Sequence, residues 1–404
     1  MVVGAQVWYG NRHSYYDLRI YYDAMHWWAS GHRLYEFSHL DRIQGPLGFT
    51  YPTFAAILMY PMAWLPWSFV ASLTVLANLT ALVLTTAWLT SLVADRHGWP
   101  RWYLLGLALP LATTLEPIRE TFAFGQINLM LAALVLADLL VAVPRKSSGA
   151  PRRRRWSRVG SWKLAGVGIG LATAIKLTPA IFIVYLLLTR RWRTAVTAMA
   201  TATVATLLAA ALAPADSWRY WTSALWHANQ VGHLDRIPNQ ALWGTLLRLH
   251  EPNRLLWLAL VALVAGVGLW RATRAARAGD ELAGLTLTGL VGLLVSPVSW
   301  QHHLYWFVPA ILVLVDAAAS ARPGRYRYWY GTLAAVIWGT MTIGVIAFFD
   351  YGLSYSMLDT VPGFFISNWY LLLMLLLVAV LPVTARGTTN RRTTNRAYST
   401  PSGE

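Results

Sequence analysis

Long apolar stretches separated by short polar segments run along most of the chain. A stretch of roughly 17 to 25 apolar residues is long enough to cross the hydrocarbon core of a membrane, about 30 Å thick, as one helix. The pattern therefore predicts an all-α, polytopic membrane helical bundle. The stretches expected to cross are about 68–94, 102–114 with its flanks, 127–143, 194–213, 255–270, 281–297, 304–318, 329–349 and 368–384.

Two further apolar segments are expected to enter the membrane without crossing it. Segment 164–189 is flanked by basic residues at both ends and is interrupted by Lys176 and Pro179. Proline disfavours helical geometry at the preceding residue, so this segment predicts a helical hairpin with its tip at 176–179, deep in the membrane. Segment 53–67 contains two prolines and predicts a short element that dips into the membrane or lies at its interface.

Composition and charge agree with a membrane protein. Hydrophobic residues make up 56% of the chain and charged residues only 12%, whereas about a quarter of the residues in soluble domains are charged. The absence of cysteine excludes a disulfide scaffold and cysteine-ligated zinc. The net charge of +16 resides in short connections and the tail, where it signals topology and gives no reason to expect nucleic acid.

The basic connections also predict which loops face outward. Because cytoplasmic loops carry an excess of Lys and Arg, we place 144–163, 271–279, 319–328 and the tail on the cytoplasmic side. Most acidic residues then lie outside, so any chemistry is expected to be extracytoplasmic. The outer loops are 10–52, 115–126, 214–253, 298–303 and 350–367.

Two of these outer loops carry candidate catalytic or binding residues. Asp17 lies early in the first loop, beside Arg19 and among tyrosines, and is a candidate general base for an acceptor hydroxyl; a solvated acid paired with an arginine is the alternative. The second loop is polar at the mouth of two spans, where ligand binding competes with ordinary helix capping. Its polar residues are Glu116, Arg119, Glu120, Gln126 and Asn128.

Lys176 is the strongest single candidate for binding an anion. An ionisable group deep in an apolar stretch is costly and indicates function, and an ammonium group suits a lipid-linked phosphate. The alternative is a side chain that snorkels to the interface.

Two histidines and two amides complete the set of candidates. His302 and His303 are adjacent, so they do not form the i, i+4 pair of a zinc helix, and they suit hydrogen bonds to phosphate or sugar oxygens instead. Asn239 and Gln240 offer amide donors and acceptors for a hydroxyl-rich ligand, although many loops contain such residues.

Together these residues form an ordered set of short motifs. The set is Asp-Leu-x-x-Tyr (17–21), Phe-Thr-Tyr-Pro (49–52), Glu-Pro-Ile (116–118), Phe-Gly-Gln-Ile-Asn (124–128), Ile-Lys-Leu-Thr-Pro-Ala (175–180), Asn-Gln (239–240) and Ser-Pro-Val-Ser-Trp-x-His-His (296–303). It resembles family 87 of the GT-C glycosyltransferases of actinobacteria, which includes polyprenyl-phosphate-mannose-dependent α-1,2-mannosyltransferases.

The resemblance implies a GT-C bundle of about 10–12 membrane helices in a single catalytic domain, 1–385, followed by a basic, disordered tail, 386–404. Family members have a membrane helix before the aspartate that matches Asp17, so the first helix is expected to be truncated here. Most members also read Tyr-Pro-Pro where this chain has Tyr51-Pro52-Thr53.

The resemblance further implies inverting transfer with Asp17 as the catalytic base. It implies a polyprenyl-phosphate-mannose donor, a glycolipid acceptor of the phosphatidylinositol mannoside or lipomannan type, and no metal or other cofactor. The donor phosphate is expected at Lys176, His302 and His303. The residues expected to bind the sugar or the acceptor are Arg19, Tyr51, Glu116, Arg119, Gln126, Asn128, Asn239 and Gln240.

Two other functions stay open from the sequence. The first is the same chemistry with arabinofuranose as the transferred sugar. The second is a non-catalytic lipid transporter. Three features of the sequence argue against it: it has no inverted repeat, it has no nucleotide-binding loop, and its acids are concentrated on one face. The acceptor itself cannot be chosen from these residues.

Overall fold

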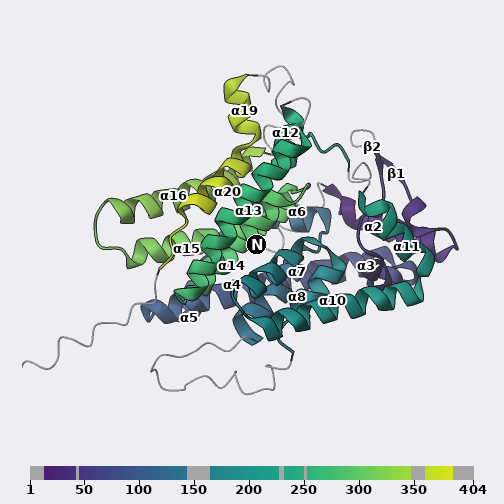
Figure 1. Ribbon diagram of the computed structural model, residues 1–404, viewed down its shortest axis with the longest axis horizontal. Helices are drawn as coiled ribbons and strands as arrows, with labels where there is room; N and C mark the ends of the chain where they lie inside the picture. Colours follow the sequence, from purple (N-terminus) through teal and green to yellow (C-terminus); the bar gives the residue numbers. More distant parts are fainter. Residues whose placement is uncertain are drawn as a thin grey trace, which may run out of the picture.

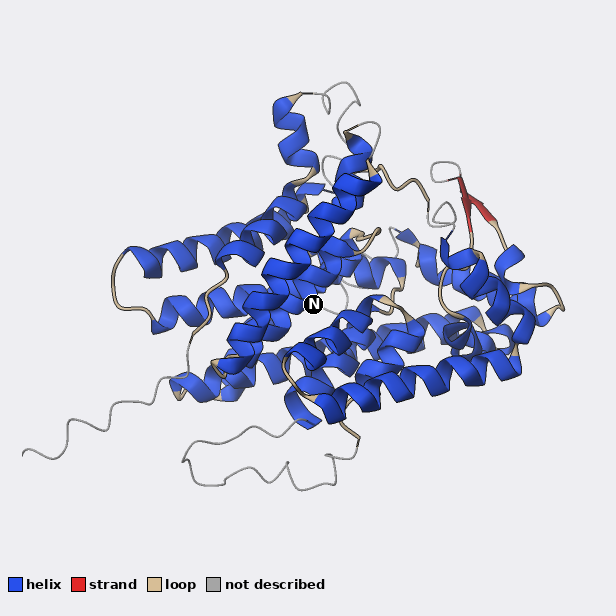
Figure 2. Ribbon diagram, in the orientation of Figure 1, coloured by secondary structure: helices blue, strands red, loops and turns tan. Residues whose placement is uncertain are grey.

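The computed structural model is almost entirely helical (Figures 1 and 2), which confirms the all-α fold class. It describes residues 13–41, 45–142, 164–226, 232–249, 253–346 and 360–384. The predicted basic loop 144–163 and the tail 386–404 lie outside these ranges, as does the start of the chain. The strands found in the described part are β1 (His39–Asp41) and β2 (Gly45–Leu47), which pair antiparallel.

Four of the described helices are long and apolar enough to cross a membrane. The number rises to six if two bent helix pairs each count as one span. Several other apolar segments in the described part fold into helices shorter than the roughly 20 residues a crossing needs: α5 has 13 residues and α14 has 15. The expected number of membrane helices stays a prediction.

The long and bent helices form the body of the bundle (Figure 1). The four long spans are α4 (Trp67–His97), α10 (Trp192–Leu212), α13 (Arg254–Arg277) and the 3-10 helix η8 (Gln301–Trp306) with α15 (Phe307–Ser320). The bent pairs are α6 (Glu116–Phe124) with α7 (Asn128–Leu136), at 119°, and α19 (Val361–Ser367) with α20 (Trp369–Val380), at 70°. Three further helices pack against the long ones: α5 (Arg101–Thr113) against α4, α14 (Glu281–Val295) against α13, and α16 (Arg325–Ile343) against α15.

The predicted hairpin is confirmed. Its two arms are α8 (Val167–Ile175) and α9 (Ile181–Leu188), and the extended backbone of Lys176 separates them. Gly166, just before α8, lies against the first turn of α10: a Cβ on Gly166 would stand 2.3 Å from the carbonyl oxygen of Thr194. Only three residues separate the end of α9 from the start of α10. Both ends of the hairpin are therefore at one level, and Lys176 is at the other end.

Glycines allow the hairpin to pack closely between α7 and α10. A Cβ on Gly168 would lie 2.6 Å from a backbone oxygen of α7, and one on Gly170 would lie 2.5 Å from a backbone oxygen of α10. Such small residues let helix backbones approach within a membrane. Asp138, in the π-helical extension of α7 (Ala137–Ala142), accepts a hydrogen bond from the amide of Ile169 at 2.8 Å and so fixes the start of the hairpin.

The structure confirms that the segment predicted at 53–67 is a short element, and its position relative to the membrane stays a prediction. It consists of α3 (Thr53–Met59) and the 3-10 helix η2 (Tyr60–Trp64), with prolines on both sides. Phe54 packs against Ala174 near the hairpin tip and against Ala205 of α10.

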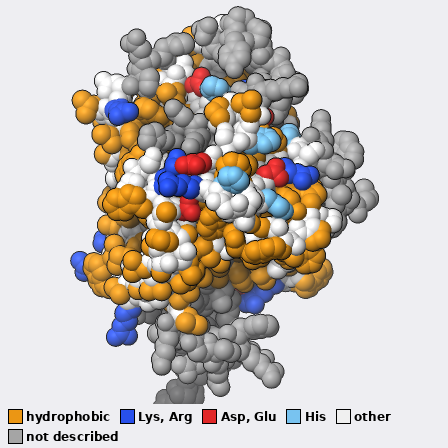
Figure 3. Space-filling model, turned by 90° about the vertical axis from the view of Figure 1, so that its right-hand side faces the viewer, with side chains coloured by type: hydrophobic (Ala, Val, Ile, Leu, Met, Phe, Trp, Pro, Cys, Tyr) orange, Lys and Arg blue, Asp and Glu red, His pale blue; other side chains and the backbone are white. Residues whose placement is uncertain are grey.

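A smaller region covers the end of the bundle where the hairpin tip lies (Figure 1). Its core includes Met25, Tyr35 and Phe49, and it is built from α2 (Tyr16–Ala29), the β-hairpin, α3 and α11 (Pro214–Thr222). The neighbouring helix α12 (Leu242–Arg248) precedes α13. On this face, Lys, Arg, Asp, Glu and His side chains gather in a band above a mostly hydrophobic surface (Figure 3).

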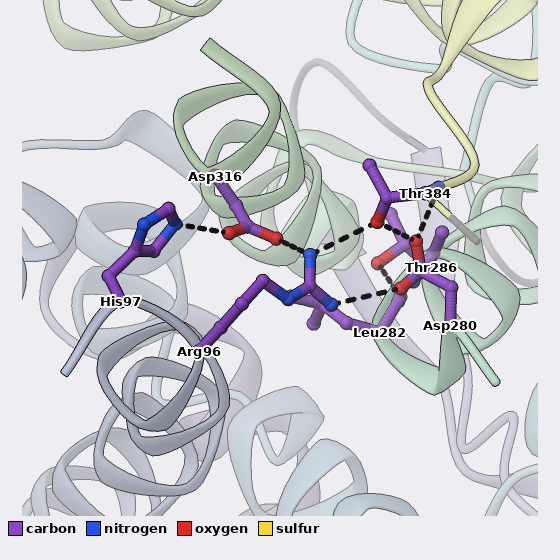
Figure 4. A network of polar contacts seen from close by, with 8 residues as sticks. Arg96, His97, Asp280, Leu282, Thr286, Asp316 and Thr384 are labelled. Atoms are coloured by element: carbon purple, nitrogen blue, oxygen red, sulfur yellow. Dashed lines mark hydrogen bonds and ion pairs between the residues drawn. The ribbon is translucent and has the colours of Figure 1, made fainter. Parts of the chain in front are cut away.

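A buried ionic network joins four elements at the opposite end of the bundle (Figure 4). Arg96 of α4 pairs with Asp316 of α15 and lies 3.8 Å from Asp280 at the start of α14, while His97 contacts Asp316 at 2.8 Å. Thr384, after α20, donates its amide to Asp280 at 2.9 Å. Both aspartates are 3% exposed, so the network ties the C-terminal segment to the bundle.

Candidate active site

A cavity of about 1380 Å³ opens between the bundle and the smaller region. Four structures from distant parts of the sequence form its walls: α2, the elbow between α6 and α7, the tip of the hairpin, and η8 with the loop before it. Because the cavity forms only where these segments meet, no single stretch of sequence encodes it.

Asp17 lines this cavity and is held by an amide. Nε2 of Gln126 donates to Oδ2 of Asp17 at 2.6 Å and to the hydroxyl of Tyr21 at 3.0 Å, and Oε1 of Gln126 accepts from the hydroxyl of Tyr51 at 3.0 Å. The backbone oxygen of Gln126 accepts from Asn78 of α4 at 2.8 Å. A carboxylate held in this way has a fixed orientation toward the cavity.

The elbow that carries Gln126 depends on a glycine. Gly125 adopts a left-handed conformation with φ of 69°, and a Cβ there would lie 2.6 Å from the Cβ of Leu18. Only glycine combines this conformation with so close an approach. The α6–α7 elbow can therefore contact α2 directly, which places the amide beside Asp17.

The environment of Asp17 raises its pKa to about 6, from an ordinary value of 3.8. Burial is the largest cause, because it disfavours the charged form, and the nearby carboxylate of Glu120 adds to it. The hydrogen bond from Gln126 and the positive charge of Lys176 act in the opposite direction. A carboxylate that titrates near neutral pH is suited to proton transfer.

Lys176 reaches the same cavity from the hairpin tip. Its Nζ donates to Oδ1 of Asn128 at 3.1 Å and lies 3.0 Å from Nε2 of His303 and 5.4 Å from the ring centre of Tyr51. The oxygen of Asn128 and the ring nitrogen of His303 accept hydrogen bonds from the ammonium group and so solvate its charge. Among the described residues, no carboxylate forms an ion pair with Lys176. An anion in the cavity would supply the opposite charge.

His302 adds a second imidazole to this wall. Its backbone oxygen accepts from Asn128 at 3.0 Å and from Thr121 at 3.3 Å. The side chain is 6% exposed, and its Nε2 finds no hydrogen-bond partner within the ranges that the structure describes. A buried ring nitrogen at a cavity wall, without a protein partner, is suited to a ligand oxygen.

Comparisons with known proteins decide the family. The model of glycosyltransferase family 87 matches residues 49–297, which is more than half of the chain. The chain belongs to glycosyltransferase family 87. The match includes Gln126 and Lys176, while Asp17 and the two histidines lie on either side of it. The alternative of a non-catalytic lipid transporter is not supported, because the family consists of glycosyltransferases.

Curated relatives from mycobacteria are similar over most of the chain. A polyprenol-phosphate-mannose-dependent α-(1-2)-phosphatidylinositol mannoside mannosyltransferase of Mycobacterium tuberculosis is 39% identical over 74% of this chain and 69% of its own length. The protein of that name from Mycolicibacterium smegmatis is 34% identical over 81% and 76%. A phosphatidylinositol pentamannoside mannosyltransferase of the same organism is 32% identical over 81% and 76%. No solved structure matches.

Seven of the residues that the sequence predicted for this family-87 site line the cavity, and Asn128 accepts a hydrogen bond from Lys176 beside it. The seven are Asp17, Tyr51, Arg119, Gln126, Lys176, His302 and His303. One guanidinium nitrogen of Arg119 also donates to the backbone oxygen of Thr342 at 2.8 Å.

The structure places four other predicted residues away from the cavity, in roles that hold the fold together. The guanidinium of Arg19 lies 3.9 Å over the ring of Trp67, and Arg19 is exposed. Glu116 is fully buried and accepts from the hydroxyl of Tyr370.

The two amides of the 232–240 loop are likewise fully buried. Asn239 accepts from the amide of Ser299 at 2.9 Å, and Gln240 donates to the backbone oxygen of Ser367 at 2.8 Å. Both side chains join this loop to neighbouring segments. Arg19, Glu116, Asn239 and Gln240 therefore do not line the cavity, and the expectation that they bind the substrate stays a prediction.

The structure also adds residues to the site. Arg236 lines the cavity and was not among the predicted site residues. Glu120, which is 4% exposed, lines it too; it was expected only as one of the polar residues of the second outer loop. Tyr21 and Asn78 support Gln126. Arg236 and Asn78 reach the site only through tertiary packing.

No group of three His, Cys, Asp or Glu side chains that could hold a metal ion occurs in the described ranges. The expectation of metal-independent transfer stays a prediction.

Proposed function

We propose that this protein transfers mannose from a polyprenol-phosphate-mannose donor to a phosphatidylinositol mannoside, forms an α-1,2 linkage and inverts the donor configuration. The observation that carries the proposal is one cavity with a carboxylate of raised pKa on one wall and a lysine–histidine cluster on another. The names of the mycobacterial relatives support mannose over arabinofuranose.

In this proposal, the cluster on the hairpin side holds the donor phosphate. Lys176 supplies the charge, Nε2 of His302 donates a hydrogen bond to a phosphate oxygen, and His303 holds Lys176 in place through its Nε2. The polyprenyl tail lies in the surrounding membrane, next to the apolar residues at the inner end of the cavity, such as Ile181 and Val295. Preorganised donors at the place where charge develops on the leaving group are the main source of rate enhancement in such sites.

Asp17 is proposed as the base. It takes the proton of the attacking acceptor hydroxyl, whose oxygen bonds to the anomeric carbon while the carbon–oxygen bond to phosphate breaks. The bonding electrons leave with the polyprenyl phosphate, which is stable as an anion. A second carboxyl group that protonates the leaving group, as in inverting glycoside hydrolysis, is therefore not needed.

The other polar residues of the cavity are proposed to bind sugar hydroxyls. Glu120 can accept hydrogen bonds from them, and Arg119 and Arg236 can donate. The aqueous end of the cavity, where these side chains lie, would receive the acceptor. Confinement of both lipids to one leaflet raises the concentration of the acceptor near the donor.

The extracytoplasmic position of this cavity and its independence of metal ions are parts of the proposal. The basic loops predicted for the cytoplasmic side support the first part. The higher identity to the M. tuberculosis relative supports a phosphatidylinositol mannoside acceptor over the pentamannoside.

The test is a transfer assay in membranes, with labelled polyprenol-phosphate mannose and each of the two acceptors. The wild type is expected to extend the mannoside by one α-1,2-linked residue, with EDTA present or absent, and Asp17→Ala is expected to form no product. Transfer of arabinofuranose in place of mannose, or unchanged product with Asp17→Ala, would refute the proposal.

A further inference from the structure

The hydrogen bonds around Gln126 form a closed ring with a single direction. Nε2 of Gln126 donates to the hydroxyl of Tyr21 at 3.0 Å, Tyr21 donates to the hydroxyl of Tyr51 at 3.3 Å, and Tyr51 donates to Oε1 of Gln126 at 3.0 Å. Each hydroxyl has one proton to give, so one donor fixes the other two. The second N–H of the amide points at Oδ2 of Asp17, 2.6 Å away.

The direction of the ring is coupled to the charge of Asp17. An ionised carboxylate only accepts hydrogen bonds, and the amide nitrogen only donates them. Rotation of the amide by half a turn would reverse the ring and set Oε1 of Gln126 against the carboxylate, with two acceptors facing each other. The observed direction is therefore the one that suits ionised Asp17.

The ring also explains why Gln126 is not free to bind a sugar. Its side chain is 3% exposed, and both of its N–H groups and its Oε1 are engaged within the protein. Tyr21 and Tyr51 are similarly buried, at 6% and 4%. Asn78, from α4, holds the backbone oxygen of Gln126 at 2.8 Å and so connects the ring to the bundle.

We propose that Gln126, held by Tyr21 and Tyr51, is the positioning residue of Asp17: it binds Oδ2 and leaves Oδ1 to receive the proton of the acceptor hydroxyl. This inference rests on the proposed function, in which Asp17 is the base. Gln126 itself does not contact the reacting atoms, and its effect passes through the orientation and the charge of Asp17.

The experiment compares pH profiles of kcat and kcat/KM in purified, membrane-reconstituted enzyme. Gln126→Met keeps the shape of the side chain and removes the donor. Since each hydrogen bond to a carboxylate favours its ionised form, the acidic limb of the profile is expected to move up by about one pH unit. The kcat on the plateau is expected to fall about 100-fold, because the carboxylate loses its fixed orientation.

Two further variants grade the effect and control for it. Tyr51→Phe opens the ring but leaves the bond from Gln126 to Asp17, so a loss of roughly 3- to 10-fold in kcat is expected. Tyr185→Phe also removes a buried hydroxyl, one that donates to Glu281 at 3.1 Å at the far end of the bundle, and its pH profile is expected to match the wild type.

Asp17→Asn separates this inference from the proposed function. If that variant retains full transfer, the base assignment fails, whatever Gln126→Met does. If it is inactive while Gln126→Met keeps the acidic limb in place and loses activity only in proportion to folded protein, measured by size-exclusion chromatography, the positioning role is refuted and the base assignment stands.

Discussion

Replacement of Asp17 by asparagine is expected to abolish transfer and at the same time stabilise the protein. The asparagine side chain keeps the shape and can still accept a hydrogen bond from Gln126, but it cannot take a proton from the acceptor. For the wild type, a pKa of about 6 predicts that about 90% of the molecules carry an ionised base at pH 7 and about 10% at pH 5. The kcat/KM is thus expected to fall about tenfold per pH unit on the acidic side.

The same raised pKa has a consequence for stability. Its rise from 3.8 to about 6 means that the folded protein holds the proton more tightly than the unfolded chain. The contribution of protonated Asp17 to the free energy of unfolding is therefore complete below about pH 4, and it is lost as the pH rises through about 6. At about 1.4 kcal/mol per pH unit, ionised Asp17 costs up to about 3 kcal/mol, and Asp17→Asn removes that cost.

Transfer assays and thermal unfolding between pH 4 and pH 8 measure both effects. Asp17→Asn is expected to unfold at a higher temperature than the wild type at pH 7.5 and at nearly the same temperature at pH 4. Asp23→Asn, on the same helix but away from the cavity, is the matched control and should leave both profiles unchanged. An active Asp17→Asn variant, or one that is no more stable at neutral pH, would contradict the reasoning.

Three other substitutions probe the rest of the structure. Lys176→Met is expected to raise the KM for the donor by at least tenfold, since a charge-assisted contact to phosphate contributes about 1.5–3 kcal/mol; an unchanged KM would remove it from the phosphate site. Gly170→Ala is expected to lower the unfolding temperature of the protein, because the new Cβ would lie 2.5 Å from a carbonyl oxygen of α10. Gly106→Ala is the control, because a Cβ there meets nothing within 4 Å. Asp316→Asn breaks a buried ion pair and is expected to destabilise the protein by about 3–5 kcal/mol, with kcat per folded molecule unchanged. Asp95→Asn breaks an exposed pair and is expected to cost less than about 1 kcal/mol. Equal losses of stability in the two variants would refute the importance of burial.

The sequence by itself determined the local architecture. Apolar length predicted the helical bundle, and the charges at both ends of 164–189, with Lys176 and Pro179 between them, predicted a hairpin that the structure confirms. These features are readable because they depend on the solvation of residues close in the chain: a charge or a proline has the same local cost in any fold. The sequence also selected seven of the residues that line the cavity.

Only the tertiary structure decided which polar residues share the cavity. Glu116 and Glu120 lie one helical turn apart on α6, yet the first accepts from Tyr370 and the second lines the cavity. Gln126 has the chemistry of a sugar ligand, but two tyrosines from distant segments engage it. Hydrogen-bonding capacity is a property of a residue, whereas the partner that uses it is set by packing between segments far apart in the sequence. One amino-acid sequence taken alone does not indicate which of these partners each polar side chain will bind.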